Sequence, residues 1–297
     1  MLPTTVQPSR GFHHRRFAGP LAVAAIAIGV LASVPGYGQD SSQSAGSQET
    51  DSKPMKVTEV EGISEYALDN GVRILLFPDA SKDVVTVNMT VFVGSRHEGY
   101  GEAGMAHLLE HMLFKGTPDV PAGEFSRIIA ANGGRENAFT SADYTAYFQR
   151  LEKSRLETSF KLEADRMRNA LIPEDEFIKE RDVVAEERRL RTEDQPQSRA
   201  SEQFRAMAYA SSPYNHSVIG WMSDIENYQV EDARDWYRKW YAPNNATLVV
   251  AGDVQPEEVL RLAKKYYGPL KPDDVPKVKP RPEIPQNGER RAMIRIP

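Results

Sequence analysis

Apolar and polar residues alternate between positions 84 and 98, so one face of this segment is apolar throughout. The residues on that face are Val85, Val87, Met89, Val91 and Val93. A repeat of two residues predicts a β-strand. Comparable runs predict two strands within 135–151 and one at 245–254. In 63–79, Asn70-Gly71 stands between two apolar runs, which predicts a β-hairpin.

Helical patterns alternate with these strands. The segments that carry them are 104–114, 122–134, 153–171, 173–194, 223–241 and 256–268. Helices interspersed with strands that mostly pair in hairpins indicate an α+β fold. We expect a two-layer sandwich in which the helices pack on a largely antiparallel sheet.

The first 38 residues have a different pattern, which predicts a Sec-type signal peptide. A basic start precedes the apolar run Leu21–Val34, and the small residues Gly36 and Gly38 fit a cleavage site. The alternative is an uncleaved anchor, but this run is shorter than the roughly 20 residues of a spanning helix. We therefore expect a periplasmic or secreted protein of a Gram-negative bacterium, without stable membrane insertion after cleavage.

Composition divides the rest of the chain. Ser- and Gln-rich residues without aromatic side chains predict a flexible linker over 39–60. A folded domain is expected over 61–270, a proline-rich linker over 271–289, and the first strand of a truncated second domain over 290–297.

Two features of the composition restrict the chemistry. The chain has no cysteine, so disulfides, thiolate ligands and thiol nucleophiles are excluded, and a metal ion could be held only by His, Asp or Glu. The net charge is −5 with both signs interspersed, which gives no indication of a nucleic-acid partner.

The sequence HLLEH, from His107 to His111, carries the main candidate chemistry. Residues four apart lie on one face of a helix, so both histidines can bind one metal ion with Glu110 beside them. The neighbouring residues are apolar, and such polar groups would be costly to bury without a partner. A zinc hydrolase needs imidazole ligands, an open coordination position and a carboxylate base. His-x-x-Glu-His is the inverted zinc-peptidase motif.

A third ligand must come from another segment, and the helix at 173–194 supplies candidates. At 100° per residue, Glu180 and Glu187 lie in line with the apolar stripe of Val183 and Val184. Glu186 lies beside that stripe and is the alternative third ligand.

Together these motifs resemble the pitrilysin/insulinase family of zinc peptidases, and in particular the N-terminal catalytic half of its bacterial processing-peptidase-like members. The resemblance also includes "GSRHEG" at 94–99, "NAFTSADYTAYF" at 137–148 and "WYAPNNATLVVAGDV" at 240–254. It implies one Zn²⁺ per chain, held by His107, His111 and Glu187. It further implies that Glu110 is the general base and that Glu180 supports the site.

The resemblance also implies a processing-peptidase/LuxS-like metallohydrolase fold and a substrate that adds as a strand to a sheet edge, at Asn137, Ala138, Phe139 and Thr140. The expected function is zinc-dependent endopeptidase action on peptides or unfolded protein segments. A second homologous half, in the same chain or in a separate subunit, is expected to complete the enzyme. The alternative is a non-catalytic or partner-dependent subunit of such an assembly.

Overall fold

The computed structural model describes residues 54–295. The expected signal peptide and the greater part of the expected linker lie outside this range. Within it, no helix has the length and apolar character needed to cross a membrane.

The described residues form a seven-stranded sheet with the order β1-β2-β3-β7-β4-β6-β5. Its strands are β1 (Met55–Val60), β2 (Ile63–Ala67), β3 (Arg73–Pro78), β4 (Val84–Val91), β5 (Arg135–Thr140), β6 (Thr145–Glu152) and β7 (Ala246–Gly252). Neighbouring strands are antiparallel except for the pair β3 and β7. The predicted hairpin of β2 and β3 is confirmed, and β4 buries the alternate residues that the sequence pattern indicated.

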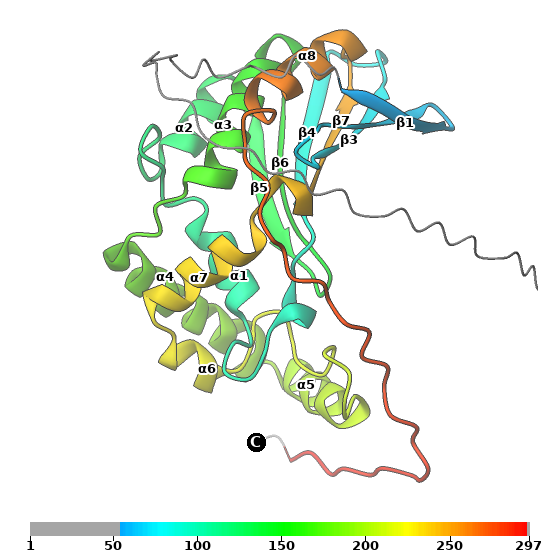
Figure 1. Ribbon diagram of the computed structural model, residues 1–297. Helices are drawn as coiled ribbons and strands as arrows, with labels where there is room; N and C mark the ends of the chain where they lie inside the picture. Colours follow the sequence, from blue (N-terminus) through cyan, green and yellow to red (C-terminus); the bar gives the residue numbers. More distant parts are fainter. Residues whose placement is uncertain (1–53, 296–297) are drawn as a thin grey trace, which may run out of the picture. The chain divides into compact units, whose positions relative to one another are not determined.

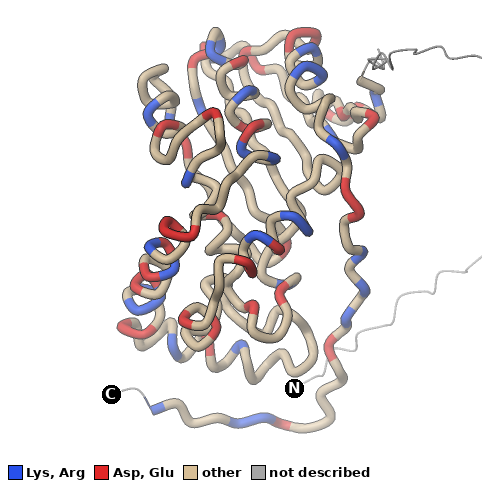
Figure 2. Tube along the Cα trace, turned by 60° about the vertical axis from the view of Figure 1, so that its left-hand side comes forward, with Lys and Arg blue, Asp and Glu red and all other residues tan. Residues whose placement is uncertain are grey.

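Helices lie against this sheet and beyond one end of its strands (Figure 1). They are α1 (Met105–Met112), α2 (Glu124–Ala131), α3 (Leu156–Asn169), α4 (Glu174–Arg188), α5 (Pro196–Ala208), α6 (Met222–Asn227), α7 (Val230–Trp240) and α8 (Pro256–Tyr266). Helix α3 packs on β4, β6 and α8, whereas α1 contacts β5, α4 and α7. The predicted α+β fold with a largely antiparallel sheet is thus confirmed. Acidic and basic residues are interspersed along the helices (Figure 2).

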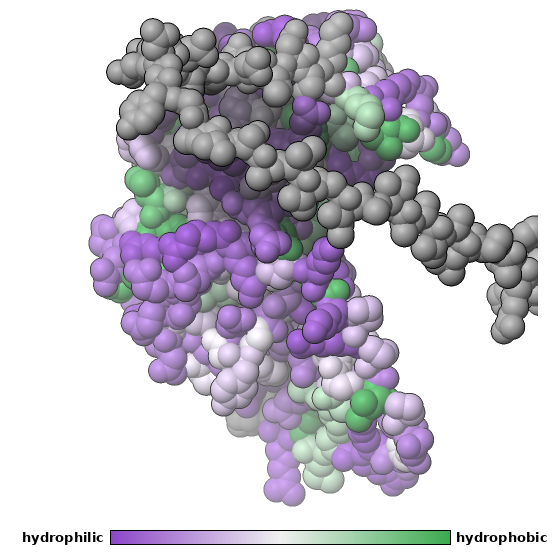
Figure 3. Space-filling view, in the orientation of Figure 1, coloured by the Kyte–Doolittle hydropathy of each residue, from purple (hydrophilic) through white to green (hydrophobic). Residues whose placement is uncertain are grey.

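Two expectations about individual elements were wrong. The helix expected at 223–241 is divided into α6 and α7, because Tyr228 and Gln229 are extended and Gln229 starts α7 in a capping box with Asp232. The linker expected up to residue 60 includes β1, which pairs with β2 through a turn at Glu61 and Gly62, both with positive φ. The apolar side chains Met55, Val57 and Val60 are exposed on this hairpin (Figure 3).

The C-terminal residues do not join the sheet. Residues 290–295 have no regular secondary structure, and the second domain expected to begin there stays a prediction. The segment from about 269 onward has no regular secondary structure. It is fastened by the Glu283 carboxylate, which accepts hydrogen bonds from the amides of Ala210 and Ser212, and by Arg290, which donates to the carbonyl of Met207.

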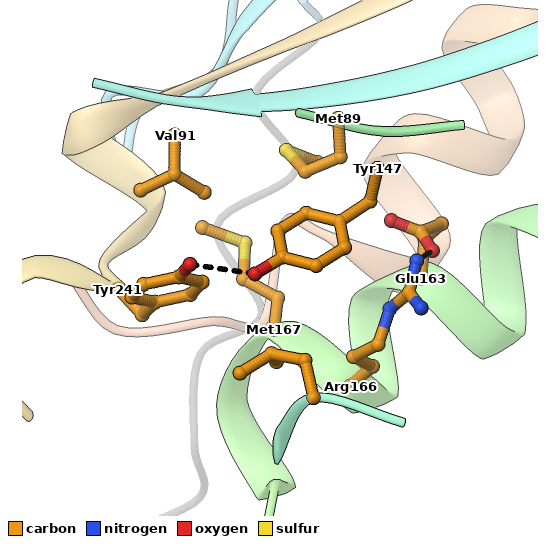
Figure 4. Close-up of a pocket in the computed structure, with 8 residues that line it drawn as sticks. Met89, Val91, Tyr147, Glu163, Arg166, Met167 and Tyr241 are labelled. Atoms are coloured by element: carbon orange, nitrogen blue, oxygen red, sulfur yellow. Dashed lines mark hydrogen bonds and ion pairs between the residues drawn. The ribbon is translucent and has the colours of Figure 1, made fainter. Parts of the chain in front are cut away.

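A charged pair lies inside the core between α3 and the sheet (Figure 4). The side chains of Glu163 and Arg166 are 1% and 3% exposed and form an ion pair. Gln149 donates a hydrogen bond to Glu163 at 2.8 Å, and burial raises the pKa of Glu163. The guanidinium carbon lies 4.2–4.8 Å from three ring centroids, those of Phe114, Phe125 and Tyr147. Since Phe114 follows α1 directly, this pair supports the end of the helix that carries the HLLEH motif.

Replacing Arg166 with Met should therefore lower the free energy of unfolding by about 3–5 kcal/mol, because Glu163 is left buried without its counter-charge. Urea unfolding at neutral pH measures this. The double variant with Glu163→Leu should regain a large part of the loss. As a control, Arg261→Met, which removes an exposed i,i+3 pair with Glu258, should leave unfolding unchanged. A wild-type midpoint for the Arg166 variant would contradict this account of the core.

Candidate metal centre

The start of α1 is fixed by two carboxylates from other parts of the chain. Glu98 accepts hydrogen bonds from the amides of Gly104 (2.8 Å) and Ala106 (2.9 Å), and Asp224 accepts one from the amide of Ala103 (3.0 Å). The amides of Gly104 and Ala106 belong to the N-terminal end of α1, where a helix has no internal acceptors for them, and Ala103 immediately precedes it. The helix dipole favours negative charge there, whereas burial raises the pKa of Glu98. These hydrogen bonds fix the start of α1 to other parts of the chain.

Helix α4 packs against α1 and brings a carboxylate to the two histidines. Glu187 Oε1 lies 3.8 Å from His107 Nε2, and Glu187 Oε2 lies 3.6 Å from His111 Nε2. One ligand atom from each residue falls within 4.8 Å of the other two. Zinc bonds of about 2.0–2.2 Å place tetrahedral ligand atoms about 3.3–3.6 Å apart. The two distances to Glu187 are close to this spacing, and the cluster as a whole would have to contract by roughly 1 Å to hold one ion.

The protonation state of His107 suits a metal ligand. Its side chain is buried, and desolvation, followed by the charges of His111 and Arg191, lowers its pKa to about 3. The imidazole is therefore neutral at physiological pH and its lone pair is available to a cation.

Glu180 lies behind His111 and does not contribute an atom to the cluster. Its Oε2 is 3.0 Å from His111 Nδ1, and its Oε1 is 2.5 Å from Lys115 Nζ. The hydrogen bond from His111, and then the contact with Lys115, lower the pKa of Glu180 to about 2. An ionised Glu180 accepts a hydrogen bond from His111 Nδ1–H, which leaves the Nε2 lone pair of His111 facing Glu187, as carboxylates behind metal-binding histidines do.

Glu110 lies beside the same cluster on α1. Thr140, the last residue of β5, donates a hydrogen bond from Oγ1 to Glu110 Oε2 at 2.6 Å. Burial raises the pKa of Glu110, against the opposing effect of this hydrogen bond. A carboxylate with a raised pKa is a better proton acceptor than an ordinary surface glutamate.

The alternative third ligand, Glu186, faces away from α1. Its side chain is 59% exposed and pairs with Arg189 at 2.8 Å. The apolar stripe of α4 is also narrower than the sequence indicated: Val184 is buried, whereas Val183 is 48% exposed. Only the side of α4 that carries Val184 contacts the rest of the domain, and Glu187 lies at its margin.

The four residues expected at the substrate edge lie on β5, the last strand of the sheet. Its outer side has no strand partner within residues 54–295. Asn137 and Phe139 are exposed, and the amide of Ala138 donates to its neighbour Asn137 Oδ1 at 2.9 Å. Since Thr140 touches Glu110, this open edge leads directly to the cluster.

Two cations at the site were missed from the sequence. Lys115 pairs with Glu180, and Arg191 Nη1 lies 2.5 Å from Glu187 Oε1. Each stands four residues after a predicted ligand, Lys115 after His111 and Arg191 after Glu187. That i,i+4 spacing was the available signal.

Sequence comparison identifies two matching families. Residues 73–220 match the family described as Insulinase (Peptidase family M16), and residues 227–296 match Peptidase M16 inactive domain. The first match contains all residues of the cluster.

Individual proteins are similar over about three quarters of this chain. The Zinc protease PqqE of Helicobacter pylori is 40% identical, over 76% of this chain and 52% of its own length. The crystal structure of a protease from Helicobacter pylori has a TM-score of 0.71 at 38% identity, covering 74% of this chain and 54% of that one. The first half of the periplasmic protease PqqL from Escherichia coli has a TM-score of 0.71 at 29% identity, covering 78% and 51%. The chain thus spans about half the length of the curated relatives it matches.

Replacing Glu187 with Gln should weaken zinc binding by more than about tenfold, because a charged ligand is lost. Competition with a chromophoric chelator measures the affinity. The matched control is Glu186→Gln, which changes the adjacent, outward-facing carboxylate and should bind zinc like the wild type. Equal affinities for the two variants would place the third ligand elsewhere.

Proposed function

Because the chain belongs to the insulinase family of peptidases, peptidase family M16, we propose that it is the catalytic half of a zinc-dependent endopeptidase. Its substrates are peptides or unfolded protein segments. The main support for the proposal is that ligand atoms of His107, His111 and Glu187 lie close to one another. Glu110 lies beside them and is hydrogen-bonded to Thr140 at the end of the open edge of β5.

The residues of the cluster fit zinc in chemistry, and their ligand atoms lie near one point. His107, His111 and Glu187 offer two imidazole nitrogens and one carboxylate, which leaves a tetrahedral ion one position for water or substrate. A zinc ion held there supplies a Lewis acid that polarises a carbonyl and lowers the pKa of water. Glu180 holds His111 in the required tautomer.

Glu110 has the role of general base. It accepts a proton from the water molecule that attacks the scissile carbonyl carbon, and it returns that proton to the amine nitrogen as the carbon–nitrogen bond breaks. Thr140 holds one carboxylate oxygen through its hydroxyl, so the carboxylate has a fixed direction. One glutamate thus serves both proton transfers.

The edge of β5 is proposed to bind the substrate backbone. An extended peptide placed there pairs with main-chain groups of Asn137 to Thr140 whatever its sequence. Phe139, which is 44% exposed, offers an apolar contact to one substrate side chain. The strand ends at Thr140, so a peptide that follows β5 arrives next to Glu110.

Two further parts of the proposal concern the whole protein. A second homologous half, from the same chain or another subunit, completes the binding chamber, and the similarity to the first half of PqqL supports this. The periplasm is the proposed location, supported by the apolar N-terminal sequence and by the similarity to PqqL, a periplasmic protease. The alternative, a non-catalytic subunit, is disfavoured because the ligands and the base are all present.

Replacing Glu110 with Gln tests the proposed chemistry. The ligands remain, so zinc content should stay at about one ion per chain. Turnover of a fluorogenic peptide should fall by about 10²–10⁴-fold, because the proton acceptor is lost. Glu186→Gln again serves as the control. Wild-type turnover by a zinc-loaded Glu110→Gln variant would exclude Glu110 as the base.

Replacing Ala138 with Pro tests the proposed substrate edge. Proline is tolerated on an edge strand and removes the amide that the edge offers to a peptide. We expect kcat/KM for extended peptides to fall by at least about tenfold, because roughly one hydrogen bond between enzyme and substrate is lost. Zinc content should not change. Ala138→Ser keeps the amide and should behave like the wild type. Equal kcat/KM for the two variants would move the substrate away from β5.

A further inference from the structure

The residue directly after Glu187 is a buried arginine. The side chain of Arg188 is 5% exposed, although it lies in a helix that is otherwise rich in exposed charges. Its two terminal nitrogens bond both carboxylate oxygens of Glu202 in α5, at 2.8 and 2.9 Å. A second carboxylate, that of Glu193, lies 3.1 Å from Arg188 Nη2. Arg188 is therefore held in one orientation by a planar, two-point contact.

The same guanidinium reaches the loop that supports α1. Arg188 Nη1 also donates a hydrogen bond to the carbonyl oxygen of Gly220. Ser217, three residues earlier in that loop, donates from its hydroxyl to Glu202 Oε1 at 3.0 Å. Arg188 and Glu202 thus bind the loop at two points.

The loop in turn lies directly against the first residues of α1. A Cβ atom on Gly220, which has a φ of 81°, would lie 1.7 Å from the carbonyl oxygen of Ala103. A Cβ atom on Gly104, which has a φ of 107°, would lie 2.5 Å from the carbonyl oxygen of Ile219. The two backbones therefore pack without side chains between them, and any shift of the loop is transmitted to the helix that carries His107.

A turn of π-helix, Arg189–Glu193, follows α4 and completes the arrangement. Glu193 lies five residues after Arg188, at π-helical spacing, and its carboxylate returns to Arg188. Arg191 pairs with Glu187 at the i,i+4 spacing of a regular helix. Single π-helical turns often occur at functional sites.

We propose that Arg188 is a positioning residue, which sets the place of Glu187 relative to His107 and His111 by fastening α4 to the start of α1. The proposal rests on the proposed zinc site. The connection runs from Glu187 through Arg188 and Gly220 to Gly104, three residues before His107. Lysine cannot replace Arg188 in this role, since an ammonium group lacks the fork that binds Glu202 at two points.

The test compares zinc binding by the wild type, Arg188→Lys and Arg188→Met. We expect both variants to weaken zinc affinity by about 10–100-fold, the range for residues that orient metal ligands. With cobalt in place of zinc, the visible absorption spectrum should change in band position or intensity, because the geometry of the ligands is altered. Arg189→Met is the matched control: its side chain is 48% exposed and pairs only with Glu186 among the described residues.

The outcomes separate the proposed site from the role of Arg188. A wild type that binds no zinc overturns both. A wild type that binds zinc, together with folded Arg188 variants of equal affinity and unchanged cobalt spectrum, overturns the positioning role alone. If the Arg188 variants do not fold, Glu202→Gln decides, because it keeps the volume and removes the charge. A severalfold weaker zinc affinity of this variant supports the positioning role, and wild-type affinity overturns it.

Discussion

The contact between α1 and α4 is the constraint on which the candidate site depends. His107 and His111 come from one helix and Glu187 from the other, 76 positions after His111 (187 − 111 = 76). Separations of 3.6–3.8 Å between their atoms tolerate little movement of either helix. Backbone packing at Gly104 and Gly220, together with the bonds of Arg188, is the means by which the described structure fixes them.

Burial of charge around this contact is compensated group by group. Glu98 is bonded to the amides at the start of α1, and Glu180 is placed between His111 and Lys115. Further inside, Glu163 and Arg166 neutralise each other beneath the end of α1. Such pairs add little net stability compared with apolar packing, but they fix orientation because a misplaced charge would be left unpaired. Glu110 is another example, because its carboxylate lies among apolar residues of α1 and accepts a hydrogen bond from Thr140.

The sheet places the site next to an open edge. Within residues 54–295, strand β5 has one strand partner, β6, and its last residue, Thr140, donates a hydrogen bond to Glu110. A peptide that pairs with β5 would therefore be guided to the cluster without any specific side-chain recognition. Under the proposed function, this arrangement would suit substrates that share only an extended backbone.

Local patterns in the sequence determined most of the elements. Alternation in β4, the Asn70-Gly71 hairpin and the spacing of His107 and His111 depend on neighbours within a few residues, so they were predictable. Two features were not predictable from the apolar pattern. The division between α6 and α7 depends on the capping box of Gln229 and Asp232, and strand β1 depends on the turn at Glu61 and Gly62. Helix α5 was missed because none of its side chains is fully buried and its apolar pattern is weak.

The candidate site shows the same division between local pattern and packing. The sequence indicated the histidines, Glu110, Glu180 and Glu187 as candidates, because helical spacing relates the residues within each helix and the motif is specific. It could not decide by geometry between Glu186 and Glu187, because neighbouring residues on a helix differ by only 100° and the rotation of α4 against α1 depends on packing. It also gave no sign of Arg188, whose partners lie 14 and 32 residues away. Helical spacing thus determined which side chains share a face, and only the tertiary structure decided which face meets which, since that depends on contacts between distant residues.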